Sequence, residues 1–154
     1  MIMRIINFVY IIIAGALIST NCENNCKDYE GTFDSALPFF DLNTPYAWLQ
    51  NIDESESVVN IVIYNQQDYE KYIAIRSDTL RPVIDFEKYT LLAGRAIHPT
   101  CGFIKNQKVI KKCSDYYFTV ILNSGICGAV VTVDYFVVIA KTYSEIKFDI
   151  RFEN

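Results

Sequence analysis

IKFDIRF, residues 146–152, alternates apolar and charged side chains without a break, and this stretch decides the fold. Successive side chains of a β-strand point to opposite faces, so a strict period of two predicts a strand with one buried face and one wet face. Further strands are needed to cover the buried face, and the chain supplies them upstream.

Three upstream segments have the residue types of strands. Residues 129–140 are a long apolar run, which predicts a central buried strand. Residues 115–122 are aromatic and β-branched and are followed by turn residues at 123–125. Residues 103–112 alternate in part, with a turn or bulge expected at 106–107.

The sequence predicts one helix, and it follows a strand. Residues 58–64, VVNIVIY, have the β-branched and aromatic side chains of a strand. Asn65 suits the N-cap of an amphipathic helix over about 66–75, and Asp68 adds negative charge to the first turn.

A loop over residues 76–88 then leads to a strand over 89–97. Gly94 is expected to break this strand, and Pro99 ends it because proline has no amide hydrogen for a ladder. Together these patterns predict an α+β fold, an antiparallel β-dominated sandwich or curled sheet of five to six strands with one amphipathic helix.

The chain divides into three parts by composition. Residues 1–21 are expected to be a signal peptide of the lipoprotein type. Residues 22–57 form a polar tether, in which YAWLQNI (46–52) supplies a short helical leader. Residues 58–154 form the globular β-rich domain.

The N-terminus has the order of an export signal: Arg4, an apolar run over 5–18, and then small polar residues before Cys22. The apolar run is shorter than the ~20 residues that cross a bilayer as a helix. Residues 17–22 resemble a lipobox, which makes Cys22 the expected lipidation site and the membrane a partner. Cleavage after Ala16 and an uncleaved anchor remain open.

Five cysteines leave one over if the others pair. With Cys22 acylated, the other four suffice for two disulfides in an oxidising compartment. Cys101 and Cys113 flank an expected hairpin and make the favoured bridge, with Cys127 free or paired with Cys26. Four cysteines allow three connectivities, so the pairing stays open.

Charge and motifs argue against several functions. Removing residues 1–21 takes away one basic residue and changes the net charge from −4 to about −5, which does not suit nucleic-acid binding. The basic cluster is interpreted as a solvated strand face; it comprises Lys105, Lys108, Lys111 and Lys112. We expect no metal and no cofactor, because the only histidine is His98 and no phosphate-binding or calcium-loop motif occurs.

The sequence motifs also favour a non-enzymatic function. A Cys–His nucleophile would have to combine Cys101 with His98 across a proline, and that spacing is better suited to a turn. The acidic residues lie mainly in the tether or singly on strands, without a recognisable pair. We therefore expect no catalytic residues.

Eleven tyrosines and ten phenylalanines are explained first by core packing. Tyr116, Tyr117 and Tyr135 are the exception, because they could gather near a sheet surface. An exposed aromatic patch there would mark an interaction surface.

Several segments together resemble the protease-complex-associated C-terminal (PrcB-type) domain family. They are VVNIVIYNQQDYEKYI from residue 58, RPVIDFEKYTLLAGR from residue 81, and the closing VDYFVVIAKTYSEIKFDIRF. PYAWLQNI also resembles a segment that precedes such domains in small envelope lipoproteins of Bacteroidota. The glycine-rich connector of the family is replaced here by residues 98–102, HPTCG.

The resemblance implies an exported, envelope-tethered β-rich domain without known catalysis, and one type of member associates with a surface protease complex. We therefore expect a non-enzymatic, lipid-anchored protein of the cell envelope that binds another envelope protein. The alternative is an envelope domain that binds a small molecule or glycan through its aromatic side chains.

Overall fold

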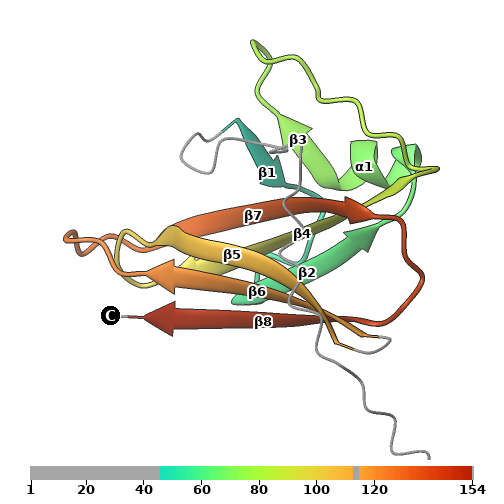
Figure 1. Ribbon diagram of the computed structural model, residues 1–154. Coiled ribbons are helices and arrows are strands. Elements are labelled where there is room, and N and C mark those ends of the chain that lie inside the picture. The colour runs from blue at the N-terminus through green and yellow to red at the C-terminus, as the bar shows by residue number, and fades with distance from the viewer. Residues whose placement is uncertain (1–45, 113–114, 154) are drawn as a thin grey trace, which may run out of the picture.

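The computed structural model describes residues 46–112 and 115–153, which form three layers (Figure 1). Within these residues the chain has eight strands and one helix. They are β1 (Ala47–Leu49), β2 (Val58–Ile63), α1 (Gln66–Tyr72), β3 (Ile73–Ile75), β4 (Tyr89–His98), β5 (Phe103–Lys112), β6 (Asp115–Asn123), β7 (Val131–Ala140) and β8 (Ile146–Glu153). The predicted α+β sandwich is confirmed.

The middle layer is an antiparallel sheet in the order β2-β4-β7. Here β4 is the central strand, and it pairs without interruption along the whole of β7, from Tyr89 opposite Ala140 to His98 opposite Val131. The apolar run predicted as a central strand is therefore largely buried but lies at the edge of its sheet. Burial comes from the layers on both faces of the sheet.

The second sheet has the order β5-β6-β8 and forms the other half of the sandwich. A register shift between Ile104 and Asn106 places a bulge in β5, next to the position expected for one. The final strand β8 pairs with β6 in parallel, which the prediction of an antiparallel sheet did not include. β7 lies between these two strands in the chain and crosses to the other sheet.

The space between the two sheets is filled by aromatic and branched side chains. Phe118 of β6 meets Tyr135 of β7 and Phe148 of β8 edge to face, with ring centroids 5.9 and 5.8 Å apart. Ile146, Phe148 and Ile150 of β8 pack against this core, as the alternation predicted. Phe152 departs from it, because the ring lies at the rim and is half exposed.

Gly94 does not break β4, contrary to prediction. The ring of Tyr135 lies across it, and a β-carbon at position 94 would be 2.1 Å from Cε2 of that ring. The Tyr135 hydroxyl thereby reaches β2 and donates a hydrogen bond to Oδ1 of Asn60 at 2.7 Å. A glycine inside a strand here marks the close approach of another group.

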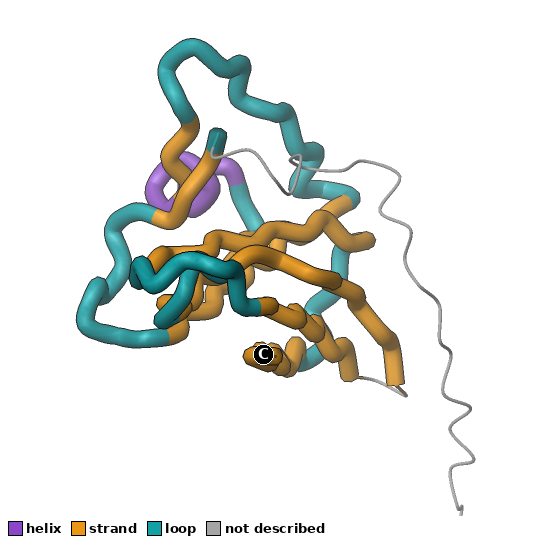
Figure 2. The backbone as a smooth tube through the Cα atoms, turned by 90° about the vertical axis from the view of Figure 1, so that its left-hand side faces the viewer, coloured by secondary structure: helices purple, strands orange, loops and turns teal. Residues whose placement is uncertain are grey.

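A small layer of β1, α1 and β3 covers the other face of the middle sheet, as Figure 2 shows from the side. The predicted cap is confirmed: Oδ1 of Asn65 accepts a hydrogen bond from the Asp68 amide at 2.8 Å. The helix ends at Tyr72 rather than 75, because residues 73–75 pair with β1.

The segment expected to be a helical leader is a strand. Ala47–Leu49 pairs antiparallel with β3, and Leu49 is buried in the core beneath α1. Packed structure thus includes residues upstream of Val58, the position predicted to begin the globular domain. Trp48 points away from this core and is partly exposed.

Candidate interaction surface

Two loops and the end of β8 meet at one end of the sandwich. The Cys101 amide donates to the Ala129 carbonyl at 2.8 Å, and the Gly125 amide donates to the Thr100 carbonyl at 3.3 Å. The Ser124 amide donates to the Glu153 carbonyl at 3.2 Å. These bonds tie the connection after β4 (99–102) to the connection before β7 (124–130) and tie both to the last strand.

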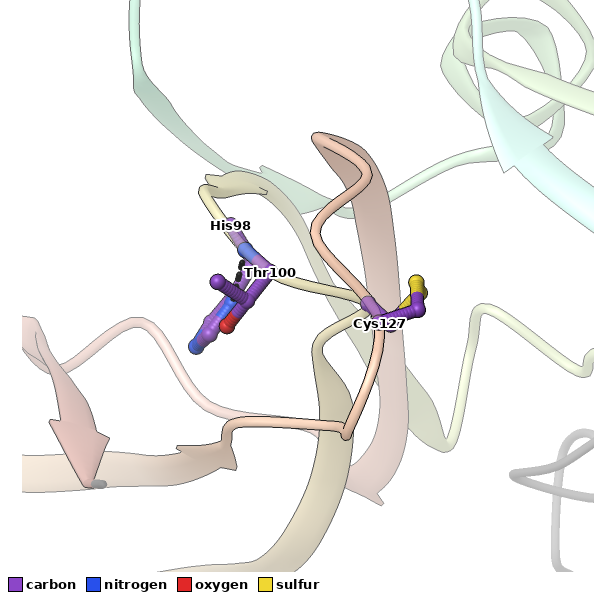
Figure 3. Close-up of a disulfide and its surroundings, with 4 residues drawn as sticks. His98, Thr100 and Cys127 are labelled. Atoms are coloured by element: carbon purple, nitrogen blue, oxygen red, sulfur yellow. Dashed lines mark hydrogen bonds between the residues drawn. A yellow bond between two sulfur atoms is a disulfide. The ribbon is translucent and has the colours of Figure 1, made fainter.

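A disulfide between Cys101 and Cys127 joins the same two loops (Figure 3), with 5.5 Å between the Cα atoms. The favoured Cys101–Cys113 bridge is therefore wrong, because Cys101 is already paired. Cys113, Cys26 and the predicted lipidation site Cys22 lie outside the described residues. The sequence could not distinguish among the pairings, since the fold alone brings residues 26 positions apart together.

The backbone next to the Cys101–Cys127 disulfide is crowded. Cys101 has a φ of 25°, in a region that non-glycine residues rarely adopt. Gly125 lies against it, and a β-carbon at position 125 would be 2.5 Å from the Cys101 carbonyl oxygen. The disulfide and the loop hydrogen bonds hold this conformation in place.

His98 is a structural residue at this end of the core. Its side chain is buried, its Nδ1 accepts a hydrogen bond from the Thr100 amide at 3.2 Å, and its ring lies 5.6 Å from that of Phe152. Figure 3 shows the imidazole and the disulfide on opposite sides of the chain connection. The Cys–His nucleophile considered from sequence lacks its thiol, because the Cys101 sulfur is bonded to Cys127.

Large apolar side chains project from the strands and loops that meet here. We call this set the end surface: Phe103 (45 % exposed), Ile126 (fully exposed), Val130 (68 % exposed) and Phe152 (47 % exposed). Ile126 stands next to the disulfide, so the staple fixes the loop that presents it. Phe103 and Phe152 lie on opposite faces of the β5-β6-β8 sheet, so Ile126 and Val130 of the connection before β7 are the main part of this surface. Exposed apolar side chains of this kind mark a candidate interaction site.

The end surface also has no charged residue in the loops that build it. Residues 96–104 and 116–133 contain no Asp, Glu, Lys or Arg. By contrast, the loop over residues 76–88, which exposes Leu80 and Val83, includes six charged residues from Arg76 to Lys88. Depletion of charge is a feature of the centre of protein interfaces.

The predicted tyrosine patch is wrong for two of its three members. Tyr135 is fully buried, and Tyr116 is only 8 % exposed. Tyr117 is partly exposed, and its ring lies 5.4 Å from the Lys147 ammonium. Burial raises the pKa of the Tyr135 hydroxyl well above its ordinary value, so it stays protonated and donates to Asn60.

An ion pair that the sequence did not reveal attaches β1 to the middle sheet. Nε of Arg95 lies 3.3 Å from Oδ1 of Asp134, and both side chains are largely buried. The Leu49 amide donates to the same carboxylate oxygen at 2.9 Å, and the Arg95 guanidinium donates to the Leu49 carbonyl. Both partners sit on neighbouring strands, opposite each other in the register.

The Asp134 carboxylate gives the fold a pH dependence. Burial raises its pKa, and the Leu49 amide and the Arg95 charge only partly oppose this. The folded chain therefore holds the proton more tightly than the unfolded chain. The stability that this group contributes is present below the ordinary pKa of an aspartate and is lost as the pH rises through the raised value.

Asp134→Asn is expected to remove this loss, because the amide does not titrate and can still accept both hydrogen bonds. The difference in unfolding temperature between the variant and the unmodified chain should therefore move in favour of the variant as the pH rises above the ordinary pKa of an aspartate. Asp53→Asn is the control with opposite sign, because hydrogen bonds from Ser55 lower the pKa of Asp53. Parallel pH profiles for Asp134→Asn and the unmodified chain would contradict this role.

Comparisons of the chain with models of protein families, with curated proteins and with solved structures find no match. Within residues 46–112 and 115–153, no helix is long and apolar enough to cross a membrane. The described part of the chain also contains no group of three or more His, Cys, Asp or Glu side chains that could hold a metal ion.

Proposed function

We propose that this chain is a non-enzymatic, lipid-anchored protein of the cell envelope that binds another envelope protein through its end surface. The observation that carries the proposal is the exposed Ile126 beside the Cys101–Cys127 disulfide, in loops without charged residues. A loop held at both ends loses little conformational freedom on binding, which favours affinity.

The disulfide also supports a location outside the cytoplasm. Disulfides persist in oxidising compartments such as the periplasm and the cell surface and are rare in the cytosol. The export signal and the lipobox-like residues before Cys22 agree with this location. Acylation at Cys22 would tether the domain through the polar segment that follows.

Membership of the PrcB-type family is part of the proposal. Its support is the resemblance of three segments, which lie on β2 and α1, on the approach to β4 and β4 itself, and on β7 and β8. Association with an envelope protease complex would follow from that membership. The glycan- or ligand-binding alternative relied on exposed aromatic side chains, and burial of Tyr116 and Tyr135 removes part of its support.

The test is capture of the partner from the native envelope by the unmodified chain and two variants. Ile126→Asp places a charge in the end surface next to the disulfide and should reduce the yield of a stoichiometric partner by about tenfold or more. Leu80→Asp is the matched control, because Leu80 is equally apolar and almost fully exposed but lies in the charged loop.

The tag must avoid the C-terminus, since Glu153 belongs to the same end of the sandwich. An antiserum against the folded domain serves instead. Equal capture by Ile126→Asp and the unmodified chain would contradict binding through the end surface. Recovery of no partner, together with retention on a glycan matrix, would contradict the proposed function itself.

A further inference from the structure

The last strand, β8, lies at the rim of its sheet, with β6 on one side only. Figure 1 shows it along the lower border of the molecule, as labelled there. Among the described residues, the strand pairs with no other element. An edge strand of eight residues presents a row of backbone groups on which another strand can pair.

The backbone directions show which residues are available. The carbonyl of Glu145 accepts a hydrogen bond from Tyr116 of β6, and that of Glu153 accepts one from Ser124, directly after β6. The odd-numbered residues of β8 therefore direct their backbone groups toward that strand. Backbone direction alternates along a strand. The groups of Ile146, Phe148, Ile150 and Phe152 therefore point outward from the edge.

The side chains of β8 alternate in the same period. Its even-numbered residues Ile146, Phe148 and Ile150 face the sandwich core. The outer face carries four charges in the order Lys147, Asp149, Arg151 and Glu153. The signs alternate along this face, whereas charges of one sign would repel a second copy in every register.

This order of charges is complementary to itself when two copies run antiparallel. If Ile150 lies opposite Ile150 of a second copy, Asp149 lies opposite Arg151. In the same register Lys147 lies opposite Glu153, and Phe148 lies opposite Phe152. All four outer-face charges of each copy then face an opposite charge, and cross-strand pairs of this kind stabilise a sheet.

Shifting one strand by two residues relative to the other keeps each side chain on the same face of the sheet. Both registers of this kind are unfavourable. With Asp149 opposite itself, Lys147 faces Arg151. With Arg151 opposite itself, Asp149 faces Glu153. Like charges directly opposite each other destabilise a sheet, so the charges exclude these two registers. Registers centred on Phe148 or Phe152 also bring opposite charges together, but they pair fewer residues of β8 than the register centred on Ile150.

Backbone geometry agrees with that register. Ile150, Phe148 and Phe152 are all residues whose amides and carbonyls point outward, so each would form a hydrogen-bonded pair across the two-fold axis. We propose that β8 is a homodimerisation edge, on which a second copy of this chain pairs antiparallel with Ile150 opposite Ile150 and joins the two outer sheets.

The ion pairs within one copy leave these charges accessible to a second strand. Lys147 lies 2.7 Å from Asp115, Lys105 lies 2.7 Å from Glu153, and Arg151 bonds to Asp149 within the strand. All of these side chains keep a substantial exposed fraction. Exposed ion pairs contribute little to stability, so sharing them with a partner costs little.

Cysteine cross-linking of the full chain in detergent tests the register. In the proposed dimer, the two Ile150 Cα atoms lie about 5.5 Å apart, within disulfide range. Phe148 would lie four residues from its own copy, more than the ~7 Å that a disulfide spans. Under mild oxidation, Ile150→Cys should give at least about fivefold more linked dimer than Phe148→Cys.

Charge variants in the Ile150→Cys background test the recognition. Asp149→Lys places two pairs of like charges across the axis and should weaken dimerisation about tenfold. Adding Arg151→Asp exchanges the two signs and should restore it. Both substitutions are on the outer face, so the unfolding temperature should stay close to that of the parent.

Equal cross-linking at positions 148 and 150 would overturn the register. Undiminished dimer with Asp149→Lys, or no recovery in the exchanged variant, would overturn the charge pairing. A parent chain that remains monomeric would overturn the proposal as a whole. Phe152 belongs to both the end surface and β8, but no variant changes a residue of the end surface and the cross-linking is measured without the partner.

Discussion

Replacing Gly94 with alanine should lower the free energy of unfolding by about 3 kcal/mol, because the added methyl group would overlap the buried Tyr135 ring. The β-carbon would be 2.1 Å from Cε2 and 2.6 Å from the hydroxyl oxygen of Tyr135. The ring cannot withdraw without losing its place between the sheets and its hydrogen bond to Asn60. Urea unfolding measures the loss.

Gly128→Ala is the matched control, because no atom lies within 4 Å of the β-carbon position there. It should leave the free energy of unfolding within about 0.5 kcal/mol of the unmodified value. The loss from Gly94→Ala should also shrink when Tyr135 is first replaced with leucine, since the two residues are in contact. A Gly94→Ala chain as stable as Gly128→Ala would refute the packing of Tyr135 over β4.

Replacing Cys101 and Cys127 together with serine should lower the free energy of unfolding by about 3 to 4 kcal/mol. The disulfide closes a loop of 26 residues, so its loss frees the unfolded chain. The loop over 124–130 should then sample other conformations, because Cys101 no longer holds its left-handed backbone. Binding of the partner should weaken as a consequence.

A reducing agent should bring the unmodified chain close to the stability of this double variant. The measurement is urea unfolding with and without reductant, on matched samples. If the double serine variant unfolds at the same urea concentration as the oxidised parent, the disulfide does not stabilise this end of the sandwich.

Local patterns in the sequence predicted the elements well. The alternation over 146–152 fixed which side chains of β8 face the core, and Asn65 marked the start of α1. Both features depend on neighbours within a few residues. They can therefore be predicted from the sequence without knowledge of the tertiary structure.

Features that depend on distant segments were not predictable in this way. Residues 47–49 and 73–75 are strands because they pair with each other, and neither is long enough to show a period. The parallel pairing of β8 with β6 likewise follows from the path of β7. Propensity is a weak guide when tertiary contacts decide the conformation.

The candidate site likewise combines features that the local sequence indicates with features that depend on the fold. Tyrosine is a residue type typical of exposed aromatic patches. Tyr135 is buried instead, because Gly94 on the adjacent strand has no side chain and leaves room for its ring. The end surface could have been suspected from the uncharged run over 116–133. Its location needed the fold, since Phe103, Ile126 and Phe152 reach the same end of the sandwich only when β5, β6 and β8 pair side by side.

Export and anchoring are tested most directly by mass spectrometry of the chain, isolated without reduction from the envelope of its own organism. We predict a mature N-terminus at Cys22 that carries acyl chains, together with a peptide linked between Cys101 and Cys127. An unmodified N-terminus after Ala16, or free thiols at both Cys101 and Cys127, would contradict a tethered domain with a stapled interaction surface.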